Sequence, residues 1–527
     1  MKYLAVIIAL AARVMAQTPE LDPALGTLHY PVSTKNAEAQ QYFDQGMKYV
    51  YAFNHEAAAD SFRHATKLDP DLAMGYWGVA LALGPNINMD VDPDREKAAY
   101  ESVQAALTHL DHASAKERDL INALTKRYTN DPNADLHKLS EVYSAAMGEV
   151  AKKYPDDVDV ATLYAESLMD LHPWRFWTHD GRPTEGTDEI VSTLQAVLKR
   201  SPNHLGANHY LIHAVEASSH PEVALASARR LKTLAPNAGH LVHMPAHILQ
   251  RTGDYAGAAQ ANTRAADVDR GWIKKHGGES MYAAMYYNHN LQFGSASYAM
   301  IGDFATSKKM ADEFGGTAIA MAKMMPPLES FATAPALVLV RFGKWRDVLG
   351  VPDPKVGATS TALWHFARGT AFARMGNILG AQSEQHELEK MLPTVTTEAG
   401  FLQNPQRDLI VVASHLLTGR IAEAGGDYAD AVSHYESAVT AEDALNYNEP
   451  ADWPLPVRET LGGALLRSGR AADAERVFNE DLKHNRNNPR SLFGLAEARK
   501  AQKKDAGAAR AEFRKLWKGG ALRIADL

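Results

Sequence analysis

Histidine recurs at two fixed places in consecutive stretches of this chain. The stretches align with an offset of 34 residues, and His209 then falls on His243. In the same alignment His213 falls on His247. Residues spaced three, four or seven apart lie on one face of an α-helix, so each stretch carries an imidazole pair on one face. The spacing predicts two neighbouring helices that present imidazoles to the same place.

This arrangement could bind a transition metal. Adjacent packed helices lie roughly 8–10 Å apart, so imidazoles from both can meet at one ion with Zn–N distances of about 2.0–2.1 Å. Several imidazoles with one carboxylate suit zinc, copper or iron, and suit calcium or magnesium poorly. The chain has no cysteine, which excludes thiolate ligands. The candidate metal ligands are His209, His213, Glu216, His240, His243, His247 and His289.

Each of these histidines has a second interpretation, as a polar contact for a bound peptide or as a core residue with a backbone partner. Other chemistry-bearing segments favour structural roles. The segment 172–177 (HPWRFW) is expected to pack as a loop over the histidines. Asn54 is expected to start a helix. Pro245 interrupts a helical pattern between His243 and His247, so a kink is expected there.

The elements that position these side chains are pairs of helices. The first pair carries large residues alternating with small ones, and a proline closes it. The marks are Tyr42, Gly46, Tyr49, Ala58, Phe62, Ala65 and Pro70. With the 34-residue period they resemble the tetratricopeptide repeat superfamily. The resemblance implies an all-α superhelical solenoid of stacked helix–turn–helix repeats, about nine or ten units over residues 37–527. Three segments (51–56, 76–86 and 240–247) resemble an exported bacterial group of such proteins of unclear function.

In this superfamily, positions 2, 5, 9 and 12 of the first helix line the concave groove. With Ala224 and Ala258 at position 20, the resemblance implies that the candidate ligands of both repeats face that groove. His289 falls near position 2 of the following repeat.

Glycine-containing turns and four insertions divide the remaining helices. The turns are expected at Gly253, Gly302, Gly343, Gly376, Gly426 and Gly469. Insertions are expected near residues 84–94, 173–186, 271–279 and 446–457, of which the second and third are loops beside the histidine repeats. The proline-rich stretch 446–457 is expected to close a pocket if it returns towards the groove.

The first residues predict export. Residues 1–16 have a basic start, a short apolar run and a small-residue cleavage site, typical of a secretory signal, with 17–36 as an N-terminal extension. The protein is therefore expected to be periplasmic or secreted. No later run is continuously apolar over about 18 residues, so no transmembrane segment is predicted. The net charge of −8 gives no reason to expect nucleic acid as a partner, and phosphate-loop and flavin motifs are absent from the sequence.

Three functions remain open. The first is a scaffold whose groove holds a partner peptide. The second is a metal-dependent protein, either an oxidoreductase or hydrolase or a copper- or zinc-handling protein. The third is a small-ligand binder whose groove is sealed by the inserted loops. A peptide scaffold needs an open channel, whereas a metal enzyme needs an enclosed cavity with one open coordination position.

Overall fold

The computed structural model describes residues 19–278, 280, 282–395 and 403–527. Regular structure in this part is helical, and no β-strand occurs among these residues, only isolated bridges at Asn86–Met89 and Trp177–Pro183. The expected all-α class of helix–turn–helix repeats is therefore confirmed. None of the described helices is long and apolar enough to cross a membrane. The predicted signal, residues 1–16, lies outside the described residues.

The described helices form two compact units, where the sequence alone suggests one continuous array over 37–527. The N-terminal unit consists of residues within 19–248 and 264–287. The C-terminal unit consists of residues within 249–263 and 288–527. Each unit is described by itself.

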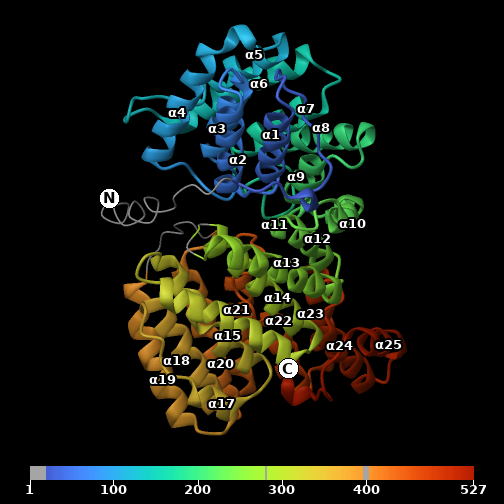
Figure 1. The fold of residues 1–527 in the computed structure, drawn as a ribbon. Helices are drawn as coiled ribbons and strands as arrows, with labels where there is room; N and C mark the ends of the chain where they lie inside the picture. Colours follow the sequence, from blue (N-terminus) through green and yellow to red (C-terminus); the bar gives the residue numbers. More distant parts are fainter. Residues whose placement is uncertain (1–18, 279, 281, 396–402) are drawn as a thin grey trace. The chain divides into compact units, whose positions relative to one another are not determined.

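Helices of the N-terminal unit follow one another as antiparallel pairs, drawn from blue to green in Figure 1. They are α1 (Ala37–Val50), α2 (His55–Leu68), α3 (Ala73–Leu83), α4 (Pro93–Thr108), α5 (Ala115–Leu124), α6 (Leu136–Lys153), α7 (Val158–Met169), α8 (Thr187–Arg200), α9 (Leu205–Val215), α10 (Leu225–Leu234), α11 (Gly239–His243), α12 (Pro245–Arg251) and α13 (Tyr255–His276). The last residues of α12 and the first part of α13 belong to the C-terminal unit.

Glycine sets the close approach of helices within a pair. The ring of Phe62 on α2 lies between α1 and α3, and a Cβ at Gly46 would lie 2.5 Å from that ring. A Cβ at Gly78 would also lie 2.5 Å from it. Any side chain at either glycine would push the helices apart, because protein interiors are close-packed. The same device recurs in the C-terminal unit, where a Cβ at Gly462 would lie 2.5 Å from the ring of Phe478.

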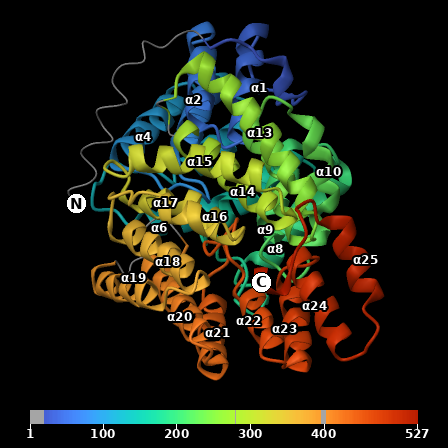
Figure 2. The same ribbon diagram turned by 90° about the horizontal axis from the view of Figure 1, so that it is seen from below.

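The C-terminal unit continues the pairing, and α22, α23 and α24 lie side by side in Figure 2. Its helices are α14 (Asn288–Ile301), α15 (Phe304–Met321), α16 (Ala334–Arg341), α17 (Trp345–Gly350), α18 (Ala358–Arg374), α19 (Ile378–Met391), α20 (Gln406–Ala424), α21 (Tyr428–Asp443), α22 (Val457–Arg467), α23 (Ala471–His484), α24 (Pro489–Ala501) and α25 (Gly507–Leu516). All six predicted turn glycines, from Gly253 to Gly469, have positive φ, the backbone region that favours glycine.

Three of the four predicted insertions are non-helical. Residues 84–92 join α3 to α4, residues 170–186 join α7 to α8, and residues 444–456 join α21 to α22 apart from single turns. The loop expected at 271–279 is wrong for residues 271–276, because α13 continues to His276. Its polar and basic residues suit the exposed last turn of a helix, where Lys274 and Lys275 complement the helix dipole. Residue 279 lies outside the described residues.

Candidate metal centre

The predicted ligands of the two histidine stretches lie on consecutive elements of the N-terminal unit. His209 and His213 are one turn apart on α9, and Glu216 follows at its C-cap. A Cβ at Gly206, at the start of α9, would lie 2.4 Å from the ring of Tyr51, so the glycine lets α9 pack closely on the segment that follows α1. The close approach brings His209 to the backbone of Tyr51, where its Nδ1 donates to the carbonyl oxygen at 2.8 Å.

The second stretch is broken as expected. His240 and His243 lie on α11, which ends at His243, and His247 lies on α12, which begins at Pro245. Proline has no N–H to continue the helical ladder, and its ring clashes with the preceding turn. Met244, the residue between the two helices, keeps α-helical φ and ψ of −49° and −35°, so His247 follows His243 by about one turn. We call His209, His213, Glu216, His240, His243 and His247 the histidine cluster.

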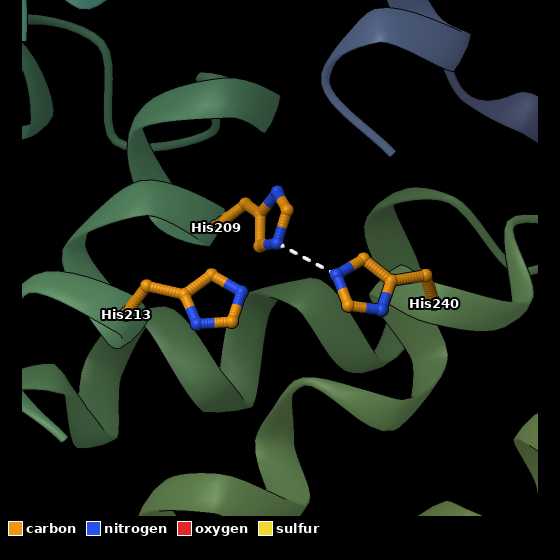
Figure 3. A group of neighbouring side chains, drawn as sticks. All are labelled: His209, His213 and His240. Atoms are coloured by element: carbon orange, nitrogen blue, oxygen red, sulfur yellow. Dashed lines mark hydrogen bonds between the residues drawn. The ribbon is translucent and has the colours of Figure 1, made fainter. Parts of the chain in front are cut away.

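Three imidazoles of the cluster converge, as Figure 3 shows. His209, His213 and His240 each offer a nitrogen within 4.8 Å of the others, and Nε2 of His209 lies 3.0 Å from Nε2 of His240. Because Nδ1 of His209 donates its hydrogen to a carbonyl, its Nε2 carries a lone pair in the neutral ring. Two nitrogens each about 2.0–2.1 Å from one ion lie about 2.8–3.0 Å apart at an angle of 90° and about 3.3–3.4 Å apart in a tetrahedral site, so the observed spacing falls within the range for a shared metal.

Glu216 orients two further nitrogens. Its carboxylate accepts a hydrogen bond from Nδ1 of His213 at 2.8 Å, and another from Nδ1 of His247. Since a carboxylate only accepts, both Nδ1 atoms carry hydrogen, and in the neutral rings both Nε2 atoms are lone pairs. Nε2 of His213 has no hydrogen-bond partner among the described residues. This carboxylate–histidine arrangement is the one that orients metal-ligating histidines.

Burial favours the neutral form of three histidines of the cluster, His209, His213 and His240. Each residue of the histidine cluster is at most 3% exposed. Burial, followed by neighbouring histidines, lowers the pKa of His209 and of His240 well below the usual range. Burial also lowers the pKa of His213 against the opposing effect of Glu216. Burial alone would raise the pKa of Glu216, but the charges and hydrogen bonds of His247 and His213 lower it to about 2. The carboxylate of Glu216 is therefore ionised inside a buried cluster of imidazoles.

The remaining pair completes the cluster. Nε2 of His243 lies 2.7 Å from Nε2 of His247, and the ring centroids are 4.6 Å apart. The rings of His213 and His247 are 5.4 Å apart, so this pair adjoins the first three imidazoles.

Aromatic side chains enclose the cluster, and sequence reasoning missed most of them. Phe53 stacks on His240 with centroids 5.4 Å apart and meets His209 edge-on at 4.5 Å. Tyr286 lies 4.7 Å from the ring of His240. Phe53 belongs to the segment 51–56, whose unusual composition was the available signal, but only the tertiary structure shows which ring covers which histidine.

The inserted loop 170–186 covers α9, as its sequence suggests. Trp174 meets the ring of His213 edge-on with centroids 5.6 Å apart, and Nε1 of Trp177 donates to the carbonyl oxygen of Ala214 at 2.7 Å. Both Phe53 and Trp174 have positive φ, at 55° and 63°, which is unusual for bulky residues. Strained backbone of this kind clusters at functional sites. The rings of Phe53 and Trp174 thus lie directly against His209 and His213.

The other predicted site residue, His289, lies on α14 in the C-terminal unit. Its role as a ligand stays a prediction. Asn54 is a helix cap as expected, with its side chain accepting from the backbone N–H of Ala57. Its neighbour His55 donates through Nδ1 to the carbonyl oxygen of Ala82 at 2.9 Å, a structural bond.

Comparisons with known proteins find only distant structural similarity. No protein-family model and no curated protein sequence matches the chain. Among solved structures, the chain is similar to the human IFIT1 dimer with m7Gppp-AAAA, with 13% identity over 92% of this chain and 91% of that one and a TM-score of 0.34. It is similar to yeast Tom70 with 13% identity, coverage of 92% and 93%, and a TM-score of 0.31. It is also similar to the APC/C hetero-tetramer Cut9–Hcn1, with 12% identity over 92% of this chain and 95% of that one and a TM-score of 0.31. The assignment to a tetratricopeptide-like class rests on the helix pairs described above.

Proposed function

We propose that the N-terminal unit contains a metal centre in which His209, His213 and His240 hold one transition-metal ion. The observation that carries the proposal is the convergence of three buried imidazole nitrogens, one of which, Nε2 of His213, has no partner among the described residues. A buried acceptor without a partner costs about 1–3 kcal/mol, and a metal ion removes that cost. Copper, zinc and iron are the ions that suit imidazole donors.

The ligand number favours a reactive site over a structural one. Three protein ligands leave a fourth position for water or substrate, whereas structural zinc sites are closed by four. The rings of Phe53 and Trp174 lie against His209 and His213, which favours a small molecule over a large one at that position. We therefore favour a metal-dependent oxidoreductase or hydrolase over a protein that only carries copper or zinc.

The place of action follows from the sequence. The predicted signal at residues 1–16 supports an exported protein, periplasmic or secreted, akin to the exported bacterial repeat group. The lack of cysteine suits such a site, because imidazole ligands, unlike thiolates, cannot be lost to disulfide formation.

Elemental analysis tests the proposal. The chain is purified without an affinity tag, beside a His209→Ala/His240→Ala variant and a matched His415→Ala/His434→Ala control. The control pair also brings two rings together, 6.0 Å apart, but in the C-terminal unit. We expect copper, zinc or iron in the wild type and in the control, and a lower metal content per chain in the cluster variant. Wild-type protein that stays empty after incubation with Cu(II), Zn(II) or Fe(II) would overturn the proposal.

A second candidate function belongs to the C-terminal unit. About 840 Å³ of empty space, its open mouth included, is lined mainly by apolar side chains, among them Phe314, Phe331, Leu337 and Trp453. The stretch 450–455 forms one wall, as expected of the proline-rich insertion. This pocket supports binding of a small apolar ligand or a partner's side chain in the repeat groove. Quenching of Trp453 fluorescence by such a ligand, absent in Trp453→Phe, would test it.

A further inference from the structure

The histidine cluster contains more nitrogen donors than one ion can use. His209, His213 and His240 already supply three, and His243 and His247 place two further Nε2 atoms 2.7 Å apart. That separation lies just below the roughly 2.8–3.4 Å expected for two imidazole nitrogens on one metal. All five rings are buried within the same unit.

The two donor sets share one positioning carboxylate. Glu216 accepts from Nδ1 of His213, which belongs to the first set, and from Nδ1 of His247, which belongs to the second. The rings also meet across the sets, His213 with His247 at 5.4 Å and His240 with His243 at 5.8 Å between centroids. Two-metal sites hold their ions about 3.5–4 Å apart, a separation that ligand sets this close can provide.

We propose that His243 and His247 bind a second transition-metal ion beside the first, so that the N-terminal unit holds a two-metal centre. This inference rests on the proposed function. Glu216 is then a positioning residue and not a ligand, because both of its oxygens accept hydrogens from histidine ligands. With only imidazole donors assigned to the pair, copper and zinc are the ions that suit it best. Two ions held this close could together activate a small oxygen ligand such as water.

The competing explanation is a simple hydrogen bond. If Nε2 of His243 carries hydrogen, it donates to the lone pair of His247 Nε2, and 2.7 Å needs no metal. The two explanations differ in the number of ions bound. The first predicts two per chain and the second predicts one.

Counting ions decides between them. Full-length protein is stripped with chelator, reloaded with Cu(II) or Zn(II), and freed of excess ion before metal and protein are measured. We expect two ions per chain in the wild type and one in His243→Gln/His247→Gln. The same single ion is expected in His209→Gln/His240→Gln. The His415→Gln/His434→Gln control should retain two.

Electron paramagnetic resonance of the Cu(II)-loaded protein adds a readout that does not depend on the variants folding. Two Cu(II) ions about 3.5–4 Å apart couple magnetically, so the wild type should show far less signal than its copper content. The double variants should show one full, uncoupled signal. One ion per wild-type chain with a full signal would overturn the second site and leave the proposed function standing. No ion in the wild type would overturn both.

Discussion

Glu216 is the residue whose role the structure defines most sharply. It lies in a buried cluster, and its two oxygens take hydrogens from histidines of different helices. The sequence predicts it as a metal ligand because carboxylates commonly are. The hydrogen bonds instead support a positioning role, in which the carboxylate fixes the tautomers of His213 and His247.

A Glu216→Gln substitution tests this role. The amide has only one acceptor oxygen, so one of the two histidines loses its partner while the volume is unchanged. We expect metal affinity to fall about 10- to 100-fold, with full loading at high metal concentration and an altered Cu(II) spectrum. Competition with a chelator of known affinity measures the change. Glu222→Gln is the control, because Glu222 pairs with the exposed His220. An unchanged affinity and spectrum would contradict the positioning role.

At the scale of single residues, the sequence predicts which side chains could meet but not what surrounds them. The four-residue spacing on two aligned helices was enough to bring His209, His213, His243 and His247 together. The covering rings of Phe53 and Tyr286 lie far from the histidines in sequence. No local pattern encodes such contacts, because they depend on how α1 and the segment after α13 pack on α9 and α11.

The break between α11 and α12 lies within the histidine cluster. α11 ends at His243, and α12 begins at Pro245, a first helical position where the missing N–H of proline is tolerated. His247 then contacts both Glu216 and His243. The break falls where the local sequence rule predicts it.

Replacing Pro245 with alanine should separate stability from metal binding. Alanine favours a continuous helix by up to about 3 kcal/mol, and the straightened helix would shift His247 relative to Glu216 at the end of α9. We expect a melting temperature that is unchanged or higher, together with a loss of metal affinity of about tenfold or more. Pro489→Ala, at the start of α24 in the C-terminal unit, is the matched control. Retained affinity in Pro245→Ala would show that the kink is not needed.

The loop 170–186 should control access to the metal. Trp177 fastens this loop to α9 through its bond to the carbonyl oxygen of Ala214. Trp177→Phe removes that bond and keeps most of the ring, so we expect removal of the metal by chelator to speed up about fivefold or more, in line with about 1 kcal/mol for one hydrogen bond. Trp364→Phe loses an equivalent bond to Val351 in the C-terminal unit and should leave the rate unchanged. Equal rates in all three proteins would argue against a covering role.

For the elements, the sequence predicted most helices, the turn glycines and three of four insertions. It failed at 271–276, where polar composition suggested a loop although the helix continues with an exposed, basic last turn. Composition alone cannot separate an exposed helix end from a loop, since both are polar.

For the whole molecule, the two compact units give metal removal a distinctive effect. The histidine cluster belongs entirely to the N-terminal unit, so metal binding should stabilise that unit. A ligand at 1,000 times its Kd contributes about 4 kcal/mol, which for a unit of this size corresponds to roughly 10 °C. Calorimetry should show two unfolding transitions. In the metal-free protein, the melting temperature of one transition should be lower by about this amount than in the metal-loaded protein, and that of the other transition should be unchanged. No shift, or an equal shift of all components, would contradict a metal site confined to one unit.

Anomalous X-ray diffraction can locate the metal in crystals of the protein purified with its own metal, when data are recorded on both sides of the metal's absorption edge. We predict an anomalous peak about 2.0–2.2 Å from the Nε2 atoms of His209, His213 and His240, with water or a small ligand in the open position. No peak among these nitrogens, in crystals whose elemental analysis shows bound metal, would place the metal elsewhere and contradict a metal centre at these histidines.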